Sequence, residues 1–286
     1  EKLCSVLANH GLTRTRIDPC LFVMNGDGFV IKAGSVVDDL LFTTNDAARF
    51  AKWFTQISEE LKFGEYNKIT MKESVDYVSL EITHDAARHW MKISQRKYVE
   101  KALQRFGMEN CKPAETPFQM GIKFHKEDMP EKPDERRVET YRKMMGTANW
   151  IVRNTCREGL YALSHLSQFL QNPSESMMKQ LCRLFRYFKF SMIHNFEGVI
   201  MQKKPDHRAF GKGGLVGRNV LYGYVDATFD CYGDSRYTEV WMINGMLVSM
   251  STHLLKIGLS STENEFVGLS HGCVTGAFLR QALEAL

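Results

Sequence analysis

The chain has 286 residues, of which 44% are hydrophobic and 24% charged, with a formal net charge of +4. This composition suits one large or two modest globular domains, and the mild basic charge permits a polyanion partner without requiring one. No apolar run is long enough to cross a bilayer, which excludes a protein with transmembrane helices.

Seven cysteines are scattered along the chain without a Cys-x-x-Cys pair. This pattern is typical of free thiols in a reducing compartment. The N-terminus has neither an initiator Met nor a signal-peptide pattern. We therefore expect an intracellular segment, cytoplasmic or nuclear, of a larger protein that does not contact a membrane.

Short apolar runs separated by turn residues predict strands over 20–24, 29–37 and 40–43. The tetrapeptide 25–28 predicts a hairpin turn between the first two strands, and Asp38-Asp39 lies at the next turn. Apolar residues at helical spacing then predict a helix from about 46 to 62, which Gly64 is expected to close.

The middle of the chain predicts two further strands, over 77–83 and 89–93. Ser94 is the predicted cap of the helix that follows. Residues 110–137 hold four of the seven prolines and are the clearest connector. Three helices are predicted after it, over 139–153, 157–171 and 175–190.

The last segment predicts three antiparallel strands followed by a helix. A basic, Gly-rich loop over 203–219 comes before the strands 220–227, 237–243 and 246–251. Asn244-Gly245 favours a two-residue hairpin turn. Thr262 with Glu265 predicts a capping box at the start of a helix that runs towards Leu286.

Adjacent aspartates on a tight hairpin are suited to holding Mg²⁺, because nucleotidyl transfer uses carboxylates that bind two metal ions. Taken alone, Asp38-Asp39 indicates a solvated turn rather than a metal site. The surrounding sequence contains an ordered series of motifs: Asp18-Pro19-Cys20-Leu21-Phe22, Tyr77 to Ile82, Ser94-Gln95 with Tyr98, Thr116-Pro117, Ser167-Gln168-Phe169 and Asn172-Pro173.

In this order, from about Leu12 to Leu286, the motifs resemble the reverse transcriptase and RNase H region of a Ty1/copia-type retrotransposon Pol polyprotein. The resemblance implies an α/β (α+β) fold: part of a reverse-transcriptase palm with a following helix over 1–118, a linker with a helical thumb or connection over 119–200, and the first half of an RNase H-like domain over 215–286.

The resemblance also implies an RNA-directed DNA polymerase that works by two-metal phosphoryl transfer with Asp38 and Asp39. The implied cofactor is Mg²⁺, and the implied partners are an RNA/DNA template-primer, an RNA–DNA hybrid and dNTP. The family's first catalytic Asp is expected upstream of residue 1.

A second two-metal site for RNase H is implied at Asp226, in Gly223-Tyr224-Val225-Asp226, and at Glu265. The alternative to Glu265 is Glu263, and Glu265 can also serve only to cap the helix. The remaining acids of the RNase H set are expected beyond Leu286, so both metal sites are expected to be incomplete in this chain.

Nucleic-acid contacts are implied at Tyr77, Val78 and Ser79, which match the family's primer-grip strand. One predicted helix carries a basic series that could contact phosphates or form a solvated face: Lys179, Arg183, Arg186 and Lys189.

Four positions depart from the family pattern: Val36, Ser79, Cys156 and Thr228. These departures keep a second interpretation open, in which the chain is a catalytically inactive remnant or a co-opted nucleic-acid-binding protein.

Overall fold

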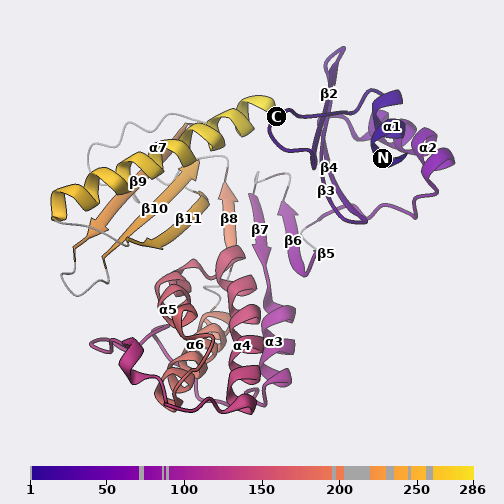
Figure 1. Cartoon of the computed structure of the whole chain (residues 1–286). Helices are drawn as coiled ribbons and strands as arrows, with labels where there is room; N and C mark the ends of the chain where they lie inside the picture. Colours follow the sequence, from indigo (N-terminus) through magenta and orange to yellow (C-terminus); the bar gives the residue numbers. More distant parts are fainter. Residues whose placement is uncertain are drawn as a thin grey trace. The chain divides into compact units, whose positions relative to one another are not determined.

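The computed structural model describes residues 2–70, 74–85, 87, 90–194, 198–202, 220–229, 235–243, 246–255 and 260–286. Helices and antiparallel sheets both occur, so the general α+β class is confirmed (Figure 1). The predicted basic loop, the Asn244-Gly245 turn and His89 lie outside the described residues. Contacts divide the chain into two units, residues 1–69 with 273–286 and residues 70–272. The predicted boundaries at 118 and 200 both fall inside the second unit and stay predictions.

The N-terminal unit is built on a four-stranded antiparallel sheet in the order β1-β2-β3-β4. Its elements are α1 (Lys2–Asn9), β1 (Thr13–Arg14), β2 (Leu21–Gly26), β3 (Phe29–Val36), β4 (Asp39–Thr44) and α2 (Ala47–Leu61). The three strands and the helix predicted here are confirmed, because alternating apolar side chains and the hairpin residues mark the strands clearly.

Helix α2 begins where Asp46 caps it, accepting hydrogen bonds from the backbone N–H groups of residues 48 and 49. Its buried residues recur at helical spacing and join the core of the sheet: Phe50, Trp53, Phe54 and Ile57. The helix ends at Lys62, whose φ of 51° lies in the left-handed region, so the prediction that Gly64 closes it is wrong.

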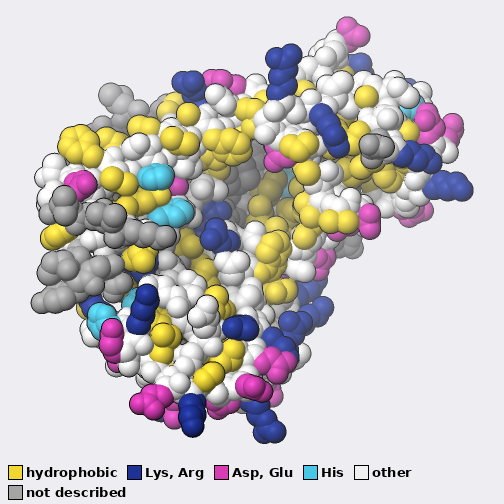
Figure 2. Space-filling view, viewed as in Figure 1, with side chains coloured by type: hydrophobic (Ala, Val, Ile, Leu, Met, Phe, Trp, Pro, Cys, Tyr) yellow, Lys and Arg dark blue, Asp and Glu magenta, His cyan; other side chains and the backbone are white. Residues whose placement is uncertain are grey.

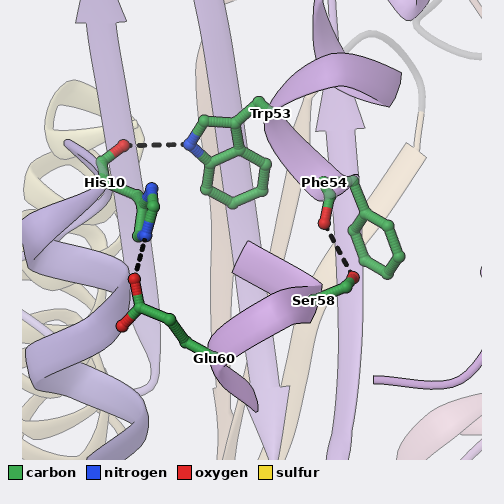
Figure 3. A network of polar contacts seen from close by, with 5 residues as sticks. All are labelled: His10, Trp53, Phe54, Ser58 and Glu60. Carbon is green, nitrogen blue, oxygen red and sulfur yellow. Dashed lines mark hydrogen bonds and ion pairs between the residues drawn. The ribbon is translucent and has the colours of Figure 1, made fainter. Parts of the chain in front are cut away.

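A polar network ties α2 to the chain that follows α1 (Figure 3). The indole N–H of Trp53 donates to the carbonyl of His10 at 2.9 Å, and His10 Nε2 lies 2.8 Å from Glu60 Oε1. Ser58 Oγ donates to the carbonyl of Phe54 at 2.7 Å. The buried indole therefore has a polar partner as well as apolar neighbours, which fixes its orientation.

The second unit opens with another antiparallel sheet, in the order β5-β6-β7-β8. Its strands are β5 (Val75–Tyr77), β6 (Leu80–Asp85), β7 (Trp90–Ser94) and β8 (Val199–Gln202). The prediction of one strand over 77–83 is wrong: the chain reverses at Val78 and Ser79, which have φ values of 54° and 64°. Neither residue type marks such a turn, but Asp76 stabilises it by accepting from the Ser79 N–H at 3.0 Å.

The helix after β7 is α3 (Arg96–Arg105), and the predicted Ser94 cap is wrong. Ser94 ends the strand, and Gln95 occupies the cap position without a capping side-chain bond. The Gln95 side chain is fully buried and accepts instead from Thr155 Oγ1 at 2.7 Å. A tertiary contact has therefore displaced the expected local cap.

The helices after this sheet lie together in a layer (Figure 1). This helical layer contains the larger of the two apolar clusters among the described residues. The predicted helices are confirmed, with these bounds: α4 (Glu135–Asn154), α5 (Leu160–Leu166), α6 (Glu175–Ile193), and the short 3-10 turns η1 (Lys126–Asp128), η2 (Arg157–Gly159) and η3 (Ser167–Phe169). Tyr141 is buried, and its hydroxyl donates to the carbonyl of Leu166 at 2.9 Å. Ser174 caps α6 by accepting from the Met177 N–H.

The third sheet has the order β11-β10-β9 and is covered by α7 (Figure 1). Its elements are β9 (Leu221–Thr228), β10 (Arg236–Ile243), β11 (Met246–Leu254) and α7 (Ser261–Ala285). The strands and the helix are confirmed, but the capping box is not at Thr262. Helix α7 begins at Ser261, and Ser260 Oγ accepts from the Glu263 N–H at 3.2 Å.

The outer surface of α7 carries exposed apolar side chains, including Phe266 and Leu269, in keeping with the hydrophobic colour along this helix in Figure 2. No helix among the described residues is long and apolar enough to cross a membrane. The six cysteines that the structure describes are all free, as their spacing predicts.

Candidate metal carboxylates and nucleic-acid contacts

Asp38 and Asp39 lie at the tip of the hairpin formed by β3 and β4. Val36 pairs with Asp39, which leaves Val37 and Asp38 as a two-residue turn. Both aspartates are exposed. Sequence analysis places both at the turn, whereas Asp39 already begins β4.

Val37 adopts a backbone conformation that valine rarely takes. Its φ is 53°, and its side chain is 89% exposed. A β-branched residue in the left-handed region is a true outlier, and such strain costs on the order of 1–3 kcal/mol. The strain lies directly beside the two candidate metal-binding aspartates.

Asp226 lies on β9, on the face opposite α7. Its neighbour Val225 contacts the helix, because a Cβ added at Gly272 would lie 2.5 Å from Val225 Cγ2. Successive side chains of a strand point to opposite faces, so Asp226 points away from the helix. Asp226 is exposed.

Glu265 is exposed near the start of α7, and its neighbour Asn264 is buried instead. Asn264 Nδ2 donates to the carbonyl of Thr228 at 3.1 Å, which fixes the first turn of the helix against the end of β9. Glu263 follows Ser260 in the first turn and is half-buried. The structure thus brings the start of α7 close to β9 while Asp226 occupies the other face of the sheet.

A buried carboxylate that sequence analysis missed lies under α7. Glu239 of β10 is 4% exposed and accepts from Ser251 Oγ at 2.7 Å. Ser251 Oγ also lies 3.0 Å from His253 Nε2. The signal that could have revealed Glu239 is strand alternation, because it shares a face with Tyr237 and Trp241.

This polar network shifts the pKa values of its neighbours. Burial, followed by the charge of Glu239, raises the pKa of Tyr237 above its usual value. Burial lowers the pKa of His253, with His271 and Arg153 acting in the same direction and Glu239 opposing them. Glu239 therefore contributes to the pKa shifts of both side chains, although it belongs to neither predicted metal site.

Three of the four predicted basic residues of α6 hold the connector in place. Arg183 Nη2 donates to Thr116 Oγ1 at 2.7 Å, and Arg186 Nε donates to the carbonyl of Lys112 at 2.6 Å. Lys189 Nζ donates to the carbonyls of Glu109 at 2.6 Å and Cys111 at 2.9 Å. We call these three side chains and the connector groups that they bind the connector clamp.

Lys179 stands outside the connector clamp and forms an exposed ion pair with Glu175 at 2.8 Å. Exposed pairs of this kind contribute little to stability. The predicted nucleic-acid role of these four residues stays a prediction, as does that of Tyr77, Val78 and Ser79 in the β5–β6 turn.

The predicted metal residues come from separate elements and form no common cluster. Among the residues that the structure describes, no group of three or more His, Cys, Asp or Glu side chains is arranged to hold a metal ion. Asp38 and Asp39 are adjacent, whereas Asp226 and Glu265 are not brought to one face.

Three curated relatives match this chain along most of its length. The chain is 24% identical to the retrovirus-related Pol polyprotein from transposon TNT 1-94 of Nicotiana tabacum, a match that covers all of this chain and 20% of the relative. It is 26% and 24% identical to the Pol polyproteins from transposons RE2 and RE1 of Arabidopsis thaliana, over 93% of this chain and 17% of each relative. No family model and no solved structure matches.

The chain spans about a fifth of the length of the relatives it matches, so its similarity concerns one segment of a much longer protein. The predicted resemblance is confirmed: this chain is similar, over nearly all of its length, to a segment of the retrovirus-related Pol polyproteins of plant retrotransposons.

Proposed function

We propose that this chain is the part of an RNA-directed DNA polymerase that supplies Asp38 and Asp39 to the polymerase metal site, followed by part of an RNase H domain. The observation that carries the proposal is the β3–β4 hairpin, in which exposed Asp38 lies in the turn beside a strained Val37 and exposed Asp39 begins β4. The similarity to Pol polyproteins supports the same assignment. Its partners would be a template-primer of RNA and DNA, with dNTP as the substrate.

Mg²⁺ is the metal that this proposal requires, and when bound it would stabilise the charge that develops on the transferred phosphoryl group. It prefers octahedral oxygen ligands and is usually bound through carboxylates together with substrate phosphates. Asp38 and Asp39 supply suitable oxygens, but the described residues offer no third carboxylate beside them. They do not fit a complete site, so we assign these two side chains a metal-holding role and derive no catalytic step.

The RNase H part of the proposal assigns Asp226 and Glu265 to a second metal site that would cut the RNA of a hybrid. The position of Asp226 on the face opposite α7 does not favour this pairing. Glu265 is exposed at the start of the helix. These two residues therefore do not fit one metal site as they stand, and the polymerase assignment is the better supported half.

A second candidate function is nucleic-acid binding without catalysis. The observation that favours it is the lack of a metal-binding cluster in the described part of the chain. Under this alternative the fold would be retained while Asp38 and Asp39 only form a solvated turn. The two functions differ in whether removing these carboxylates has a catalytic consequence.

Primer extension on a poly(rA)/oligo(dT) hybrid with Mg²⁺ tests the proposal, using this chain and the polyprotein that contains it. We expect extension by the polyprotein alone, and its loss in the Asp38→Asn/Asp39→Asn variant. Asp27→Asn is the matched control, because Asp27 lies in the neighbouring hairpin turn, where its φ of 50° suits asparagine. Undiminished extension by the double variant would refute the metal-holding role.

A further inference from the structure

The second unit contains a cationic cavity that belongs to neither predicted metal site. It has a volume of about 510 Å³ and lies between α4, the α5–η3 segment and β11. The residues of α4 that line it include Arg142, Gly146, Asn149 and Arg153. Their spacing of four, three and four residues places them along one face of the helix.

Both arginines are held so that their terminal nitrogens remain available. Arg142 Nε donates to the carbonyl of Leu170, and Arg153 Nε donates to Asn149 Oδ1, each at 2.9 Å. Within the described parts of the chain, no hydrogen bond or ion pair uses the terminal nitrogens of either side chain. Two guanidinium groups anchored in this way are pre-organised to bind phosphate oxygens.

The rest of the lining combines polar and apolar side chains and carries no acid among the described residues. Ser164 and Ser167 face the cavity from the helical layer, and Thr252 and His253 from β11. No Asp or Glu belongs to the described residues that line it. Glu239 lies next to the lining, where it accepts a hydrogen bond from the hydroxyl of Ser251. Side-chain hydroxyls, amides and guanidinium groups are the usual ligands of phosphate oxygens in nucleic acids.

The size of the cavity favours an extended polyanion over a single phosphate ion. Arg142 and Arg153 are eleven residues apart, which corresponds to roughly 16 Å along a helix. One strand of B-form nucleic acid carries a phosphate about every 3.4 Å of its axis, so several phosphates fit this length. The lining includes Leu160 and Leu163 but no Phe, Tyr or Trp that could stack on a base.

We propose that the cavity between α4, η3 and β11 binds the sugar–phosphate backbone of one nucleic-acid strand, with Arg142 and Arg153 as its main phosphate contacts. The inference shares its nucleic-acid partner with the proposed function but uses none of the carboxylates. Since no Phe, Tyr or Trp belongs to the described residues that line the cavity, binding is expected to be insensitive to base sequence.

The test measures the anisotropy of fluorescent 12-nucleotide single strands of DNA and RNA, and of a hybrid duplex, over a range of salt concentrations with the whole chain. Arg142→Gln/Arg153→Gln should weaken binding of a single strand by about tenfold or more, and reduce the salt slope by about one to two units. The matched control Lys101→Gln/Arg105→Gln removes two charges from the exposed face of α3 and should weaken it by less than about threefold.

Gly146→Leu separates occupation of the cavity from loss of charge. Nothing lies within 4 Å of a Cβ added at Gly146, so the new side chain can enter the cavity without a clash at its base. Leucine also has a better helix propensity than glycine, so the variant should remain folded. We expect it to weaken binding of a single strand by about tenfold, although the net charge is unchanged.

Several outcomes would overturn the inference. The first three are that the α3 control weakens binding equally, that Gly146→Leu binds like the wild type, and that the wild-type chain does not bind at all. The fourth is that inorganic phosphate competes at the same phosphate concentration as the strand, which would assign the cavity to free anions. Preference for the hybrid over either single strand would likewise contradict a one-strand site. Primer extension can fail while all of the expected binding results hold, so this test and that of the proposed function are independent.

Discussion

The core between α4 and α6 contains large apolar side chains. Between α7 and the β9–β11 sheet, by contrast, the buried residues include a glutamate, an asparagine and two glycines. The helical layer buries residues such as Tyr141, Phe185 and Phe188. Under α7, by contrast, Gly268 and Gly272 let the helix approach Val225 closely, and Glu239 is held by Ser251. The helical layer is stabilised by tightly packed large side chains. The region under α7 is stabilised by the close approach of two backbones and by a few polar contacts.

This difference explains why one region is easier to derive from the sequence. Helical periodicity reveals which side chains enter an apolar core. A glycine that permits close packing gives no comparable apolar signal. Strand alternation shows which face of the sheet Glu239 occupies, but not that a carboxylate is held there. Substitutions that change core volume, the distance between helix and sheet, or a buried charge should therefore change the stability of the two regions to different extents.

The largest effect is expected for Phe185→Ala in the helical layer. Phe185 is fully buried and its ring packs against Phe106 and Phe188, with centroids 5.3 and 5.4 Å away. The free energy of unfolding should fall by about 3–5 kcal/mol, measured by urea denaturation. Phe266→Ala on the exposed side of α7 is the control, with an expected change within about 0.5 kcal/mol. Similar losses in both would remove the contrast.

Gly272→Ala should have the next largest effect, because the new Cβ would lie 2.5 Å from Val225 Cγ2. Forcing α7 away from the sheet should cost about 2 kcal/mol in thermal or urea denaturation. Gly146→Ala makes the same change in α4, where no atom lies within 4 Å of the added Cβ, and should stabilise by about 0.5–1 kcal/mol. Stabilisation by both variants would mean that α7 does not need this close approach.

A smaller effect is expected when Glu239 loses its carboxylate. Glu239→Ala removes the acceptor of Ser251 and should cost about 1 kcal/mol. Glu239→Gln retains an acceptor oxygen for that hydroxyl and should cost less. Parallel urea denaturation of the two variants tests this order, and an unchanged stability in both would show that the buried carboxylate is not required for packing.

The smallest effect concerns the pH dependence given by His253. Its folded pKa lies below the ordinary histidine value of about 6.5, chiefly because of burial. The unfolded state then binds the proton more readily, so the stability contribution is present above pH 6.5 and declines as pH falls towards the folded pKa. NMR titration should place the folded pKa below 6.5, and His253→Asn should flatten the stability profile in that window. A folded pKa above 6.5 would contradict the assignment.

Much of the fold follows from local sequence, and its exceptions have identifiable physical causes. The α2 segment was predictable because its apolar spacing and Asp46 cap agree. The turn at Val78 and Ser79 was not, because neither residue favours positive φ and Asp76 stabilises the turn from outside it. The cap position before α3 was not predicted to be Gln95, because the Gln95 side chain accepts a hydrogen bond from Thr155, sixty residues away.

The resemblance selects candidate site residues, but it does not predict how they are arranged. Asp38, Asp39, Asp226 and Glu265 stay predictions as metal ligands, and the sequence cannot tell which face of β9 Asp226 occupies until the partner of Val225 is known. The cations of α6 illustrate the same limit. Their helical spacing is visible, but the connector groups that three of them bind lie 67–80 residues earlier in the chain.

The connector clamp has a mechanical consequence. Proline-rich segments between folded parts often serve as swivels, because few contacts restrain them. Here the carbonyls of Glu109, Cys111 and Lys112 are bonded to α6, and the Ala114 N–H donates to the carbonyl of Arg186. This stretch can bend freely only after the basic side chains of α6 release it. Any bending of the chain at this segment would therefore be coupled to the integrity of α6.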